Sequence, residues 1–266
     1  ARFASAYAWR LDPPDFHAVF EAWLDGRWYL FDATRQAALD GLVRIGVGRD
    51  MRVSSPSLAD AFIAGARRQG AEVVDYGMIA TDMIYYAVGT DDLDGGAQIT
   101  ASHNPKQYNG CKMVGRGNVP LSGDSGISDI RDMLTANRIP PPAATPGALA
   151  YRSIMEGYAK HVLSFIDPSI VKPFKAVLDA GCGMGGLVAP ELFKALPCRT
   201  ERLCFTVDGT FPTHEANPLI EENRRDIVAR VRADRAEIGI AWDGDADRCF
   251  FIDEDGEFIS GDFVTA

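Results

Sequence analysis

Three aspartates stand within the six residues Asp243-Gly244-Asp245-Ala246-Asp247-Arg248, directly after the apolar run Ile238–Trp242. That run predicts a buried strand, so the carboxylates are expected at a strand end. Carboxylates this close repel one another unless a cation neutralises them. Oxygen ligands favour Mg²⁺ over zinc. The spacing therefore indicates a magnesium site, against the alternative of a solvated acidic turn.

Two other readings of this loop fit it less well. In an EF-hand, the three aspartates would take positions 1, 3 and 5, with Glu254 at position 12. Position 6, normally glycine, would be Arg248, and strands rather than helices are expected on both sides. Phosphatases of the haloacid dehalogenase type place Asp-x-Asp after an apolar strand and usually have Thr or Val two residues later, where this chain has Asp247.

A second candidate for chemistry is Ser102, which follows the apolar run Ala97–Thr100. The loop after it contains Asn104-Pro105 and Asn109-Gly110, both strong turn formers. Open α/β sheets place ligand chemistry where a strand leaves the sheet. A lone serine in a turn is more often a surface residue, so the surrounding residues decide between the two interpretations.

The string Thr100-Ala101-Ser102-His103-Asn104-Pro105, followed by Tyr108-Asn109-Gly110 and Lys112, closely resembles the phosphoserine loop of the α-D-phosphohexomutases. The resemblance is strongest to the phosphomannomutase/phosphoglucomutase branch. The loop Asp243–Arg248 matches the metal loop of that family at every position. The resemblance begins at Val47-Gly48-Arg49-Asp50 and covers about residues 47–266.

This resemblance implies an isomerase of carbohydrate metabolism that moves a phosphoryl group between O1 and O6 of a hexose phosphate. Ser102 would carry the phosphoryl group and share one Mg²⁺ per chain with Asp243, Asp245 and Asp247. Lys112 is the main candidate for proton transfer or charge stabilisation, and His103 is a weaker one. Arg248 would orient the phosphoserine or the substrate.

The implied partners are mannose or glucose 1- or 6-phosphate and the hexose 1,6-bisphosphate. The family's third and fourth domains, with a Gly-Glu-Met-Ser-Gly-His motif and an Arg-x-Ser-Gly-Thr loop, are absent from these residues. The chain is therefore expected to be a truncated and poorly active fragment. The alternatives are a non-catalytic module that binds Mg²⁺ or a phosphosugar, and a phosphatase-like hydrolase.

The elements that must position these residues follow a β-α-β-α rhythm. Strands are expected at 44–47, 72–75 and 97–100, with helices beginning at Ser55-Pro56 and covering 83–88 and 125–135. The Pro-rich stretch 137–150 predicts a linker, followed by a helix over 151–165 and a strand over 176–179. The predicted fold is two consecutive three-layer α/β/α phosphohexomutase-type domains, 42–140 and 151–266, with mostly parallel sheets.

Residues 1–41 have a different character. Two β-rich runs around Asp25-Gly26 predict a hairpin that pairs Leu24 with Arg27 and Val19 with Asp32, with His17 beside Asp32. The segment resembles the later part of transglutaminase-like domains, which need a cysteine before the histidine, and the first cysteine here is Cys111. We expect an inert hairpin remnant and hypothesise that residues 1–46 were joined by recombination or by faulty sequence assembly.

The composition of the chain limits the classes of binding partner and the cellular compartment that we expect. The formal net charge of −10 argues against nucleic acid and anionic membranes as partners. Because no long apolar run or signal peptide is evident, a cytoplasmic location is expected. Five cysteines without a CxxC pair favour reduced thiols over disulfides or a zinc site. Cys111 and Cys182 are interpreted as buried apolar fillers, and His214 as a surface residue of a loop.

Overall fold

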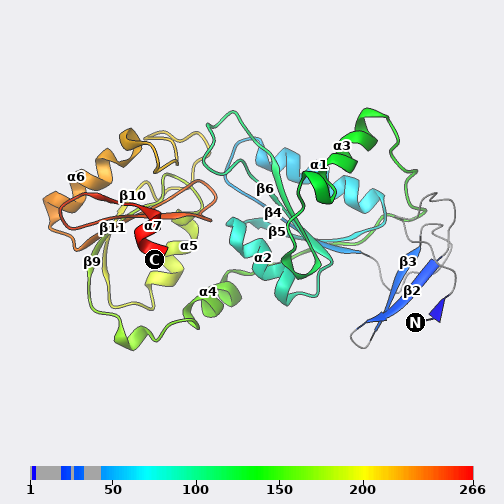
Figure 1. The fold of residues 1–266 in the computed structure, drawn as a ribbon, viewed down its shortest axis with the longest axis horizontal. Helices are drawn as coiled ribbons and strands as arrows, with labels where there is room; N and C mark the ends of the chain where they lie inside the picture. The colour runs from blue at the N-terminus through cyan, green and yellow to red at the C-terminus, as the bar shows by residue number, and fades with distance from the viewer. Residues whose placement is uncertain (1, 4–18, 25–26, 33–42, 266) are drawn as a thin grey trace.

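The protein consists of two α/β units placed side by side and a small three-stranded sheet near the N-terminus (Figure 1). The computed structural model describes residues 2–3, 19–24, 27–32 and 43–265. Among these residues, no helix combines the length and the apolar character needed to cross a lipid bilayer.

The first unit has a five-stranded sheet in the order β7-β6-β4-β5-β8. β4 pairs in parallel with β5 and β6, β5 pairs in parallel with β8, and only β7 is antiparallel to its neighbour. The strands are β4 (Arg44–Arg49), β5 (Glu72–Met78), β6 (Gly95–Ile99), β7 (Cys111–Gly115) and β8 (Leu149–Tyr151). The helices are α1 (Ser55–Arg68), α2 (Thr81–Thr90) and α3 (Ile127–Thr135), with short 3-10 turns at Arg116–Asn118 and Gly123–Ser125.

The N-cap of helix α1 is one residue earlier than the sequence suggests. Ser54, not Ser55, is its N-cap residue, and Pro56 lies in the first turn as expected. The Ser55 hydroxyl is fully buried and donates to Asp50 Oδ1 at 2.5 Å, so it is not free to cap the helix. Ala59 and Ile63, on the same face of α1 as Ser55, pack against the sheet.

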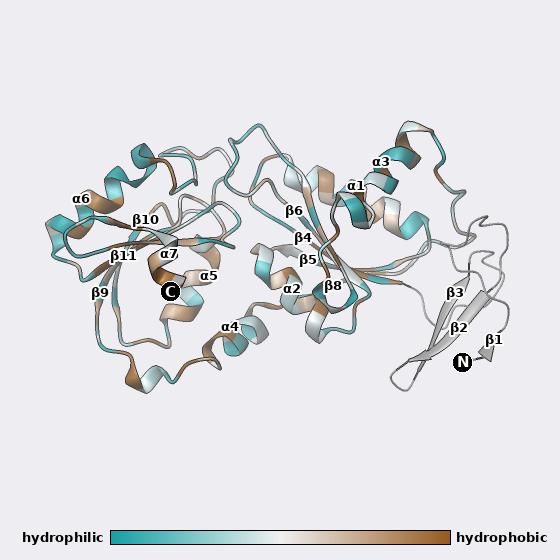
Figure 2. Ribbon diagram, viewed as in Figure 1, coloured by the Kyte–Doolittle hydropathy of each residue, from teal (hydrophilic) through white to brown (hydrophobic). Residues whose placement is uncertain are grey.

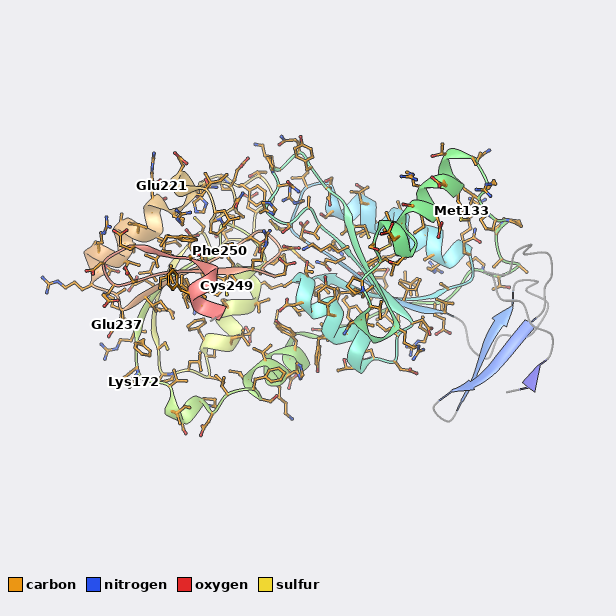
Figure 3. The ribbon with its side chains drawn as sticks, in the orientation of Figure 1. Met133, Lys172, Glu221, Glu237, Cys249 and Phe250 are labelled. Atoms are coloured by element: carbon orange, nitrogen blue, oxygen red, sulfur yellow. The ribbon has the colours of Figure 1, made fainter. Side chains whose placement is uncertain are left out.

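The second unit has a mixed sheet in the order β10-β9-β11-β12-β13. β9 is parallel to β10 and β11, whereas β12 and β13 continue as an antiparallel hairpin around Asp255-Gly256. The strands are β9 (Lys175–Asp179), β10 (Arg199–Leu203), β11 (Ile238–Trp242), β12 (Cys249–Ile252) and β13 (Phe258–Ile259). Figure 3 labels Cys249 and Phe250, with which β12 begins.

Four helices of the second unit lie within the described residues, on both sides of its sheet (Figure 1). They are α4 (Met155–Leu163), α5 (Gly185–Phe193), α6 (Arg225–Asp234) and α7 (Gly261–Thr265), with 3-10 turns at Pro168–Ile170 and Glu221–Arg224. Helix α6 carries both hydrophilic and hydrophobic residues (Figure 2), and its Ile227 and Val231 are the buried ones. This amphipathic pattern is what attaches a helix to a sheet.

The stretch predicted as a linker ends inside the first sheet. Leu149–Tyr151 form β8, which pairs with β5, and α4 begins at Met155 rather than at Tyr151. Gly147 permits this approach, because a Cβ atom there would lie 1.8 Å from the carbonyl oxygen of Ala71. The open edge of β5 offers unpaired backbone groups, and the departing chain satisfies them before it crosses to the second unit.

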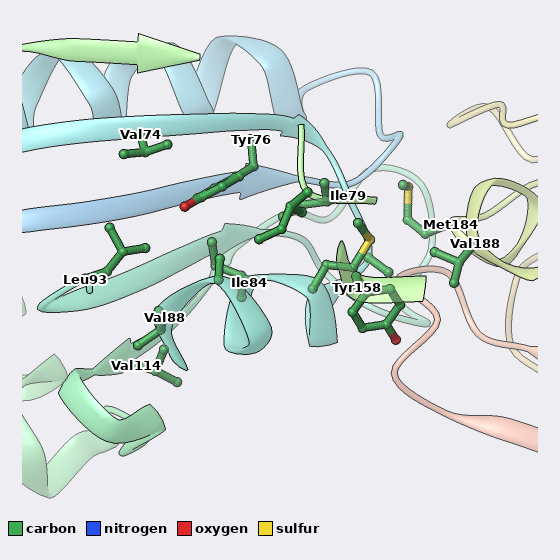
Figure 4. Close-up of a cluster of buried hydrophobic side chains, with 14 residues drawn as sticks. Val74, Tyr76, Ile79, Ile84, Val88, Leu93, Val114, Tyr158, Met184 and Val188 are labelled. Carbon is green, nitrogen blue, oxygen red and sulfur yellow. The ribbon is translucent and has the colours of Figure 1, made fainter. Parts of the chain in front are cut away.

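The largest apolar cluster reaches from the first unit into the second. Figure 4 shows Leu93, Ile84 and Val88 from the first unit together with Met184 and Val188 of the second. Tyr158 of α4 lies in the same cluster. The two units therefore share buried surface, and this surface fixes how the loops at their junction face each other.

The N-terminal sheet is formed by β1 (Arg2–Phe3), β2 (Val19–Leu24) and β3 (Arg27–Asp32), all antiparallel. The predicted register is confirmed, because Leu24 pairs with Arg27 and Val19 with Asp32. The turn Asp25-Gly26 and His17 lie outside the described residues.

The shared core generates a stability prediction. Leu93 is 1% exposed, so Leu93→Ala leaves a cavity and is expected to lower the free energy of unfolding by about 2–5 kcal/mol. Leu134→Ala is the matched control, because Leu134 is 60% exposed and its loss is expected to cost less than about 0.5 kcal/mol. Urea unfolding of both variants measures the difference, and equal midpoints would contradict the packing described here.

Candidate functional site

The loop that carries Ser102 and the loop Asp243–Arg248 meet at the junction of the two units. Ser102 Oγ donates to Asp243 Oδ2 at 2.7 Å, although the two residues are 141 positions apart in the sequence. Gly244 makes this approach possible, since a Cβ atom there would lie 2.4 Å from the Ser102 carbonyl oxygen. Any other residue at position 244 would push the two loops apart.

Ser102 is held in an unusual backbone conformation. Its φ of 53° lies in the left-handed region, which costs a residue with a side chain about 1–2 kcal/mol. The Ser102 N–H donates to Thr100 Oγ1 at 2.9 Å, and its carbonyl accepts from Arg52 Nη2 at 2.8 Å. These two bonds hold the conformation that turns the Ser102 hydroxyl toward the acidic loop.

Arg52 holds the Ser102 loop through hydrogen bonds to the loop backbone. Its side chain is fully buried and forms an ion pair with the equally buried Asp50, at 3.1 Å from Nε to Oδ2. Besides the Ser102 carbonyl, the guanidinium donates to three further loop carbonyls, those of Asn104 at 2.6 Å, Pro105 at 2.8 Å and Tyr108 at 3.1 Å. A planar guanidinium with five N–H donors suits such a task.

Sequence reasoning missed Arg52. It lies two residues beyond the Val-Gly-Arg-Asp string, so two oppositely charged residues, Asp50 and Arg52, directly follow a buried strand. That position was the available signal, because charged residues at a strand end must either be solvated or find partners.

Asp245 is tied to the first unit by three residues. Its Oδ2 accepts from Thr81 Oγ1 at 2.5 Å, from Lys112 Nζ at 2.7 Å and from Thr100 Oγ1 at 3.3 Å. The backbone contributes too, because Thr81 N–H donates to the Asp245 carbonyl at 3.1 Å. Thr81 and Thr100 are further contacts that sequence reasoning did not identify.

Lys112 bridges two of the three aspartates. Its ammonium donates to Asp247 Oδ2 at 2.5 Å as well as to Asp245. Burial by itself lowers the pKa of Lys112, but the charges and hydrogen bonds of the two carboxylates outweigh it and raise the pKa. Lys112 therefore stays an ammonium at neutral pH.

Arg248 links the acidic loop to the serine loop. Its Nη2 donates to Ser102 Oγ at 2.6 Å, to Asp243 Oδ2 at 2.5 Å and to His103 Nδ1 at 2.5 Å. Partial burial, followed by the Arg248 charge, lowers the pKa of His103. The His103 imidazole is consequently neutral, with Nδ1 acting as an acceptor.

The pKa values of the two buried aspartates are shifted in opposite directions. Burial, and then the charge of Asp245, raises the pKa of Asp243 to about 6. Burial acts on Asp245 in the same direction, but Lys112 outweighs it and lowers the pKa of Asp245. Neighbouring carboxylates whose pKa values are shifted apart by their surroundings are typical of functional sites.

The acidic cluster has the donor atoms that a metal ion needs. One carboxylate oxygen from each of Asp243, Asp245 and Asp247 lies within 4.8 Å of the others. Asp245 Oδ1 is buried and has no hydrogen-bond partner within the described part of the chain. A buried carboxylate oxygen left unpaired is costly unless a cation binds it. The triad can therefore bind a metal ion, and its oxygen donors suit a hard divalent one.

The structure thus brings together all seven residues that the sequence analysis selected, namely Ser102, His103, Lys112, Asp243, Asp245, Asp247 and Arg248. Two other interpretations are wrong. Cys111 is exposed and is not a buried filler. His214 is not a free surface residue, because its side chain is 13% exposed and contacts the buried Asp179.

Comparison with known families gives two matches. Residues 29–138 match the α/β/α domain I of phosphoglucomutase/phosphomannomutase, and residues 156–256 match its α/β/α domain II. The first match begins within the segment that resembles a transglutaminase-like domain, and that second resemblance stays a prediction.

Individual relatives agree with these matches. The chain is 41% identical over 219 residues to a protein of Xanthomonas campestris named for phosphohexose mutases, and 38% identical over 223 residues to a phosphomannomutase of Vibrio cholerae. Each alignment covers 82% of this chain and 48% of the relative. The chain therefore spans about half the length of the curated relatives it matches.

A solved structure shows the same arrangement. The crystal structure of a phosphoglucomutase/phosphomannomutase family protein from Burkholderia thailandensis superposes with a TM-score of 0.76 at 35% sequence identity. The superposition covers 84% of this chain and 49% of that protein.

The buried Arg52 can be tested directly. Arg52→Lys keeps the charge but loses the donor geometry, so it is expected to lower the free energy of unfolding by about 3 kcal/mol. Arg49→Lys is the matched control, since its pair with Asp75 is long, at 3.8 Å, and 28% of the Arg49 side chain is exposed. Its expected loss is under about 1 kcal/mol. Urea unfolding compares them, and an Arg52→Lys variant as stable as the control would refute the role given to Arg52.

Proposed function

Because the chain belongs to the phosphoglucomutase/phosphomannomutase family, we propose that it supplies the phosphoserine and metal-binding parts of a phosphohexomutase centre. The observation that supports this most directly is the position of Ser102 Oγ, within hydrogen-bond distance of both Asp243 and Arg248. A hydroxyl held between a carboxylate and a guanidinium is suited to lose a proton and to gain a phosphoryl group.

The cofactor of this proposal is one Mg²⁺ per chain. Asp243, Asp245 and Asp247 would hold it together with an oxygen of the Ser102 phosphoryl group. When bound, the ion neutralises negative charge on the phosphoryl oxygens, which is the main requirement of phosphoryl transfer. The unpaired Asp245 Oδ1 is the feature of this chain that fits the ion best.

The reaction we propose has two transfers. In the first, the bond between phosphorus and Ser102 Oγ breaks, a bond forms to the free 6- or 1-hydroxyl of a hexose phosphate, and one proton passes from that hydroxyl to Ser102 Oγ, which is left as a free hydroxyl. The resulting hexose 1,6-bisphosphate turns over in the site. In the second transfer its other phosphoryl group returns to Ser102 Oγ, and the sugar oxygen that is left takes up a proton.

The surrounding side chains divide the remaining tasks. Arg248 orients the phosphoserine, since it already contacts Ser102 Oγ, and it can bind the substrate phosphoryl group bidentately. Lys112, placed between Asp245 and Asp247, stabilises charge or donates a proton. His103 is the second candidate for proton transfer, because its neutral ring lies against Arg248.

The substrates we propose are mannose or glucose 1- and 6-phosphates, in a cytoplasmic setting. The chain spans about half the length of the curated relatives it matches, and the family matches cover domains I and II. Contacts to the sugar and to the phosphate that does not react would have to come from elsewhere, and remote contacts of that kind contribute much of the rate. We therefore expect the 266 residues alone to accept a phosphoryl group but to isomerise hexose phosphates slowly.

Phosphorylation of Ser102 is the primary test. After incubation with Mg²⁺ and glucose 1,6-bisphosphate, the intact mass of the protein should rise by about 80 Da, one phosphoryl group. Ser102→Ala should abolish the gain, whereas Ser164→Ala, at an exposed position, should keep it. A gain that survives Ser102→Ala would contradict the assignment. Release of inorganic phosphate without sugar isomerisation would instead favour the phosphatase-like alternative, and no gain at all the non-catalytic module.

The metal site has its own test. Asp245→Asn removes one negative charge and is expected to weaken Mg²⁺ binding at least about tenfold, measured by isothermal titration calorimetry. Asp129→Asn, on the exposed first turn of α3, is the matched control and should leave the affinity unchanged. If both variants bind Mg²⁺ as the wild type does, the acidic loop is not the magnesium site.

A further inference from the structure

A second group of metal-ligating side chains lies in the second unit, apart from the acidic loop. Asp179 ends β9, Cys204 follows β10, and His214 comes from the long loop after it. One ligand atom from each of the three lies within 4.8 Å of the others. Cys204 follows Asp179 by 25 positions, and His214 follows Cys204 by 10. No spacing motif in the sequence therefore reveals the three residues as a group.

Their convergence follows from the topology of the sheet. β9 and β10 are parallel neighbours, and Asp179 is the register partner of Leu203, the residue before Cys204. The carboxyl ends of parallel strands lie at the same edge, so the carboxylate and the thiol are brought side by side. The loop then folds back and places His214 over both.

The distances match those of a tetrahedral transition-metal site. His214 Nε2 lies 3.1 Å from Asp179 Oδ2 and 3.6 Å from Cys204 Sγ. With Zn–N, Zn–O and Zn–S bonds of about 2.0–2.3 Å, tetrahedral geometry places N and O about 3.3 Å apart and N and S about 3.6 Å apart. The two donor pairs that include His214 therefore already stand near the separations that Zn²⁺ imposes, and the third pair, Asp179 with Cys204, lies within 4.8 Å.

The orientation of His214 fits the same purpose. Its Nδ1 lies 3.0 Å from the carbonyl oxygen of Glu215, which can only accept, so Nδ1 is the donor. Nε2 then faces the carboxylate and the thiol. Ligating histidines typically have one ring nitrogen fixed by such a backbone hydrogen bond while the other binds the metal. Asp179 is fixed in a similar way, because its Oδ1 accepts from Gly181 N–H at 2.9 Å.

We infer that Asp179, Cys204 and His214 form a binding site for a transition-metal ion of the Zn²⁺ type, distinct from the acidic loop. A thiolate and an imidazole select Zn²⁺ or Co²⁺ over Mg²⁺, whereas the three carboxylates of the acidic loop have the opposite preference. The alternative is a protonated His214 that pairs with Asp179 and binds no metal. Hydrogen bonds with Asp179, followed by Cys204, raise the pKa of His214 to about 11.

The site is placed to brace the Ser102 centre. Cys182 N–H donates to the Cys204 carbonyl at 2.7 Å, and two residues later Met184 N–H donates to the Gly244 carbonyl at 2.9 Å, in the acidic loop. The loop that carries His214 also carries Phe211, whose ring lies 5.4 Å from the Arg52 guanidinium. A metal that links this loop to the ends of β9 and β10 would fix two contacts with the Ser102 centre. One is the hydrogen bond from Met184 to Gly244, and the other is the contact of Phe211 with Arg52.

Cobalt substitution tests the inference on the whole chain. Co²⁺ is added under reducing conditions in an excess of Mg²⁺, and the near-ultraviolet thiolate-to-cobalt charge-transfer absorption is followed. Within the described residues no cysteine belongs to the cluster of Asp243, Asp245 and Asp247, so Co²⁺ held by those three carboxylates gives no such band. We expect a saturable band at one Co²⁺ per chain that an equimolar amount of Zn²⁺ removes.

Three variants complete the test. Cys204→Ser should abolish the band, and Cys198→Ser, whose thiol contacts Lys172 instead, should keep it. His214→Gln should weaken Co²⁺ binding at least about tenfold and decides the question if Cys204→Ser does not fold, which circular dichroism reveals. A wild type without the band, or a band that persists in a folded Cys204→Ser, would overturn the inference. Neither result depends on Ser102 phosphorylation.

Discussion

The centre depends on one buried ion pair, Asp50 with Arg52. Asp50 lies at a strand end, where it fixes the guanidinium, which is buried and donates to four carbonyls of the Ser102 loop. The four hydrogen bonds satisfy loop carbonyls that converge on the guanidinium. The left-handed conformation of Ser102 is one consequence, and the direction of its hydroxyl is another.

Charge is compensated around the acidic loop in a way that joins the two units. Two carboxylates of the second unit, Asp245 and Asp247, pair with Lys112 of the first, and Arg248 of the second unit reaches Ser102 of the first. Neither unit has a balanced set of charges by itself. Docking the units is therefore linked to neutralising the aspartates, and a cation at Asp245 would add to the same attraction.

Much of the fold and of the centre was predictable because it depends on local patterns. Apolar runs located β6 and β11, and the strings around Ser102 and Asp243 are long enough to identify a family from a single sequence. The register of β2 with β3 followed from the turn signal between the two runs. These features are encoded within a few residues of one another.

The parts that were missed depend on contacts between distant segments. Arg52 looks like any surface arginine until the loop 50 residues later folds over it. His214 has no signal of burial in its own loop, and only the pairing of β9 with β10 brings Asp179 and Cys204 beneath it. The strand β8 follows a Pro-rich stretch, and it forms because β5 offers an open edge, not because of its own sequence.

The hydrogen bond from the Thr81 amide to the Asp245 carbonyl crosses between the units within the centre itself. Any opening motion that separated the units at this point would break that bond together with the contacts of Lys112 and Ser102. A rotation that keeps them intact must have its axis close to Thr81. The outer edges of the two sheets would then move furthest, so the amplitude of this rotation should grow with distance from the Thr81 amide. The hydrogen of the Thr81 amide should remain protected from exchange with solvent.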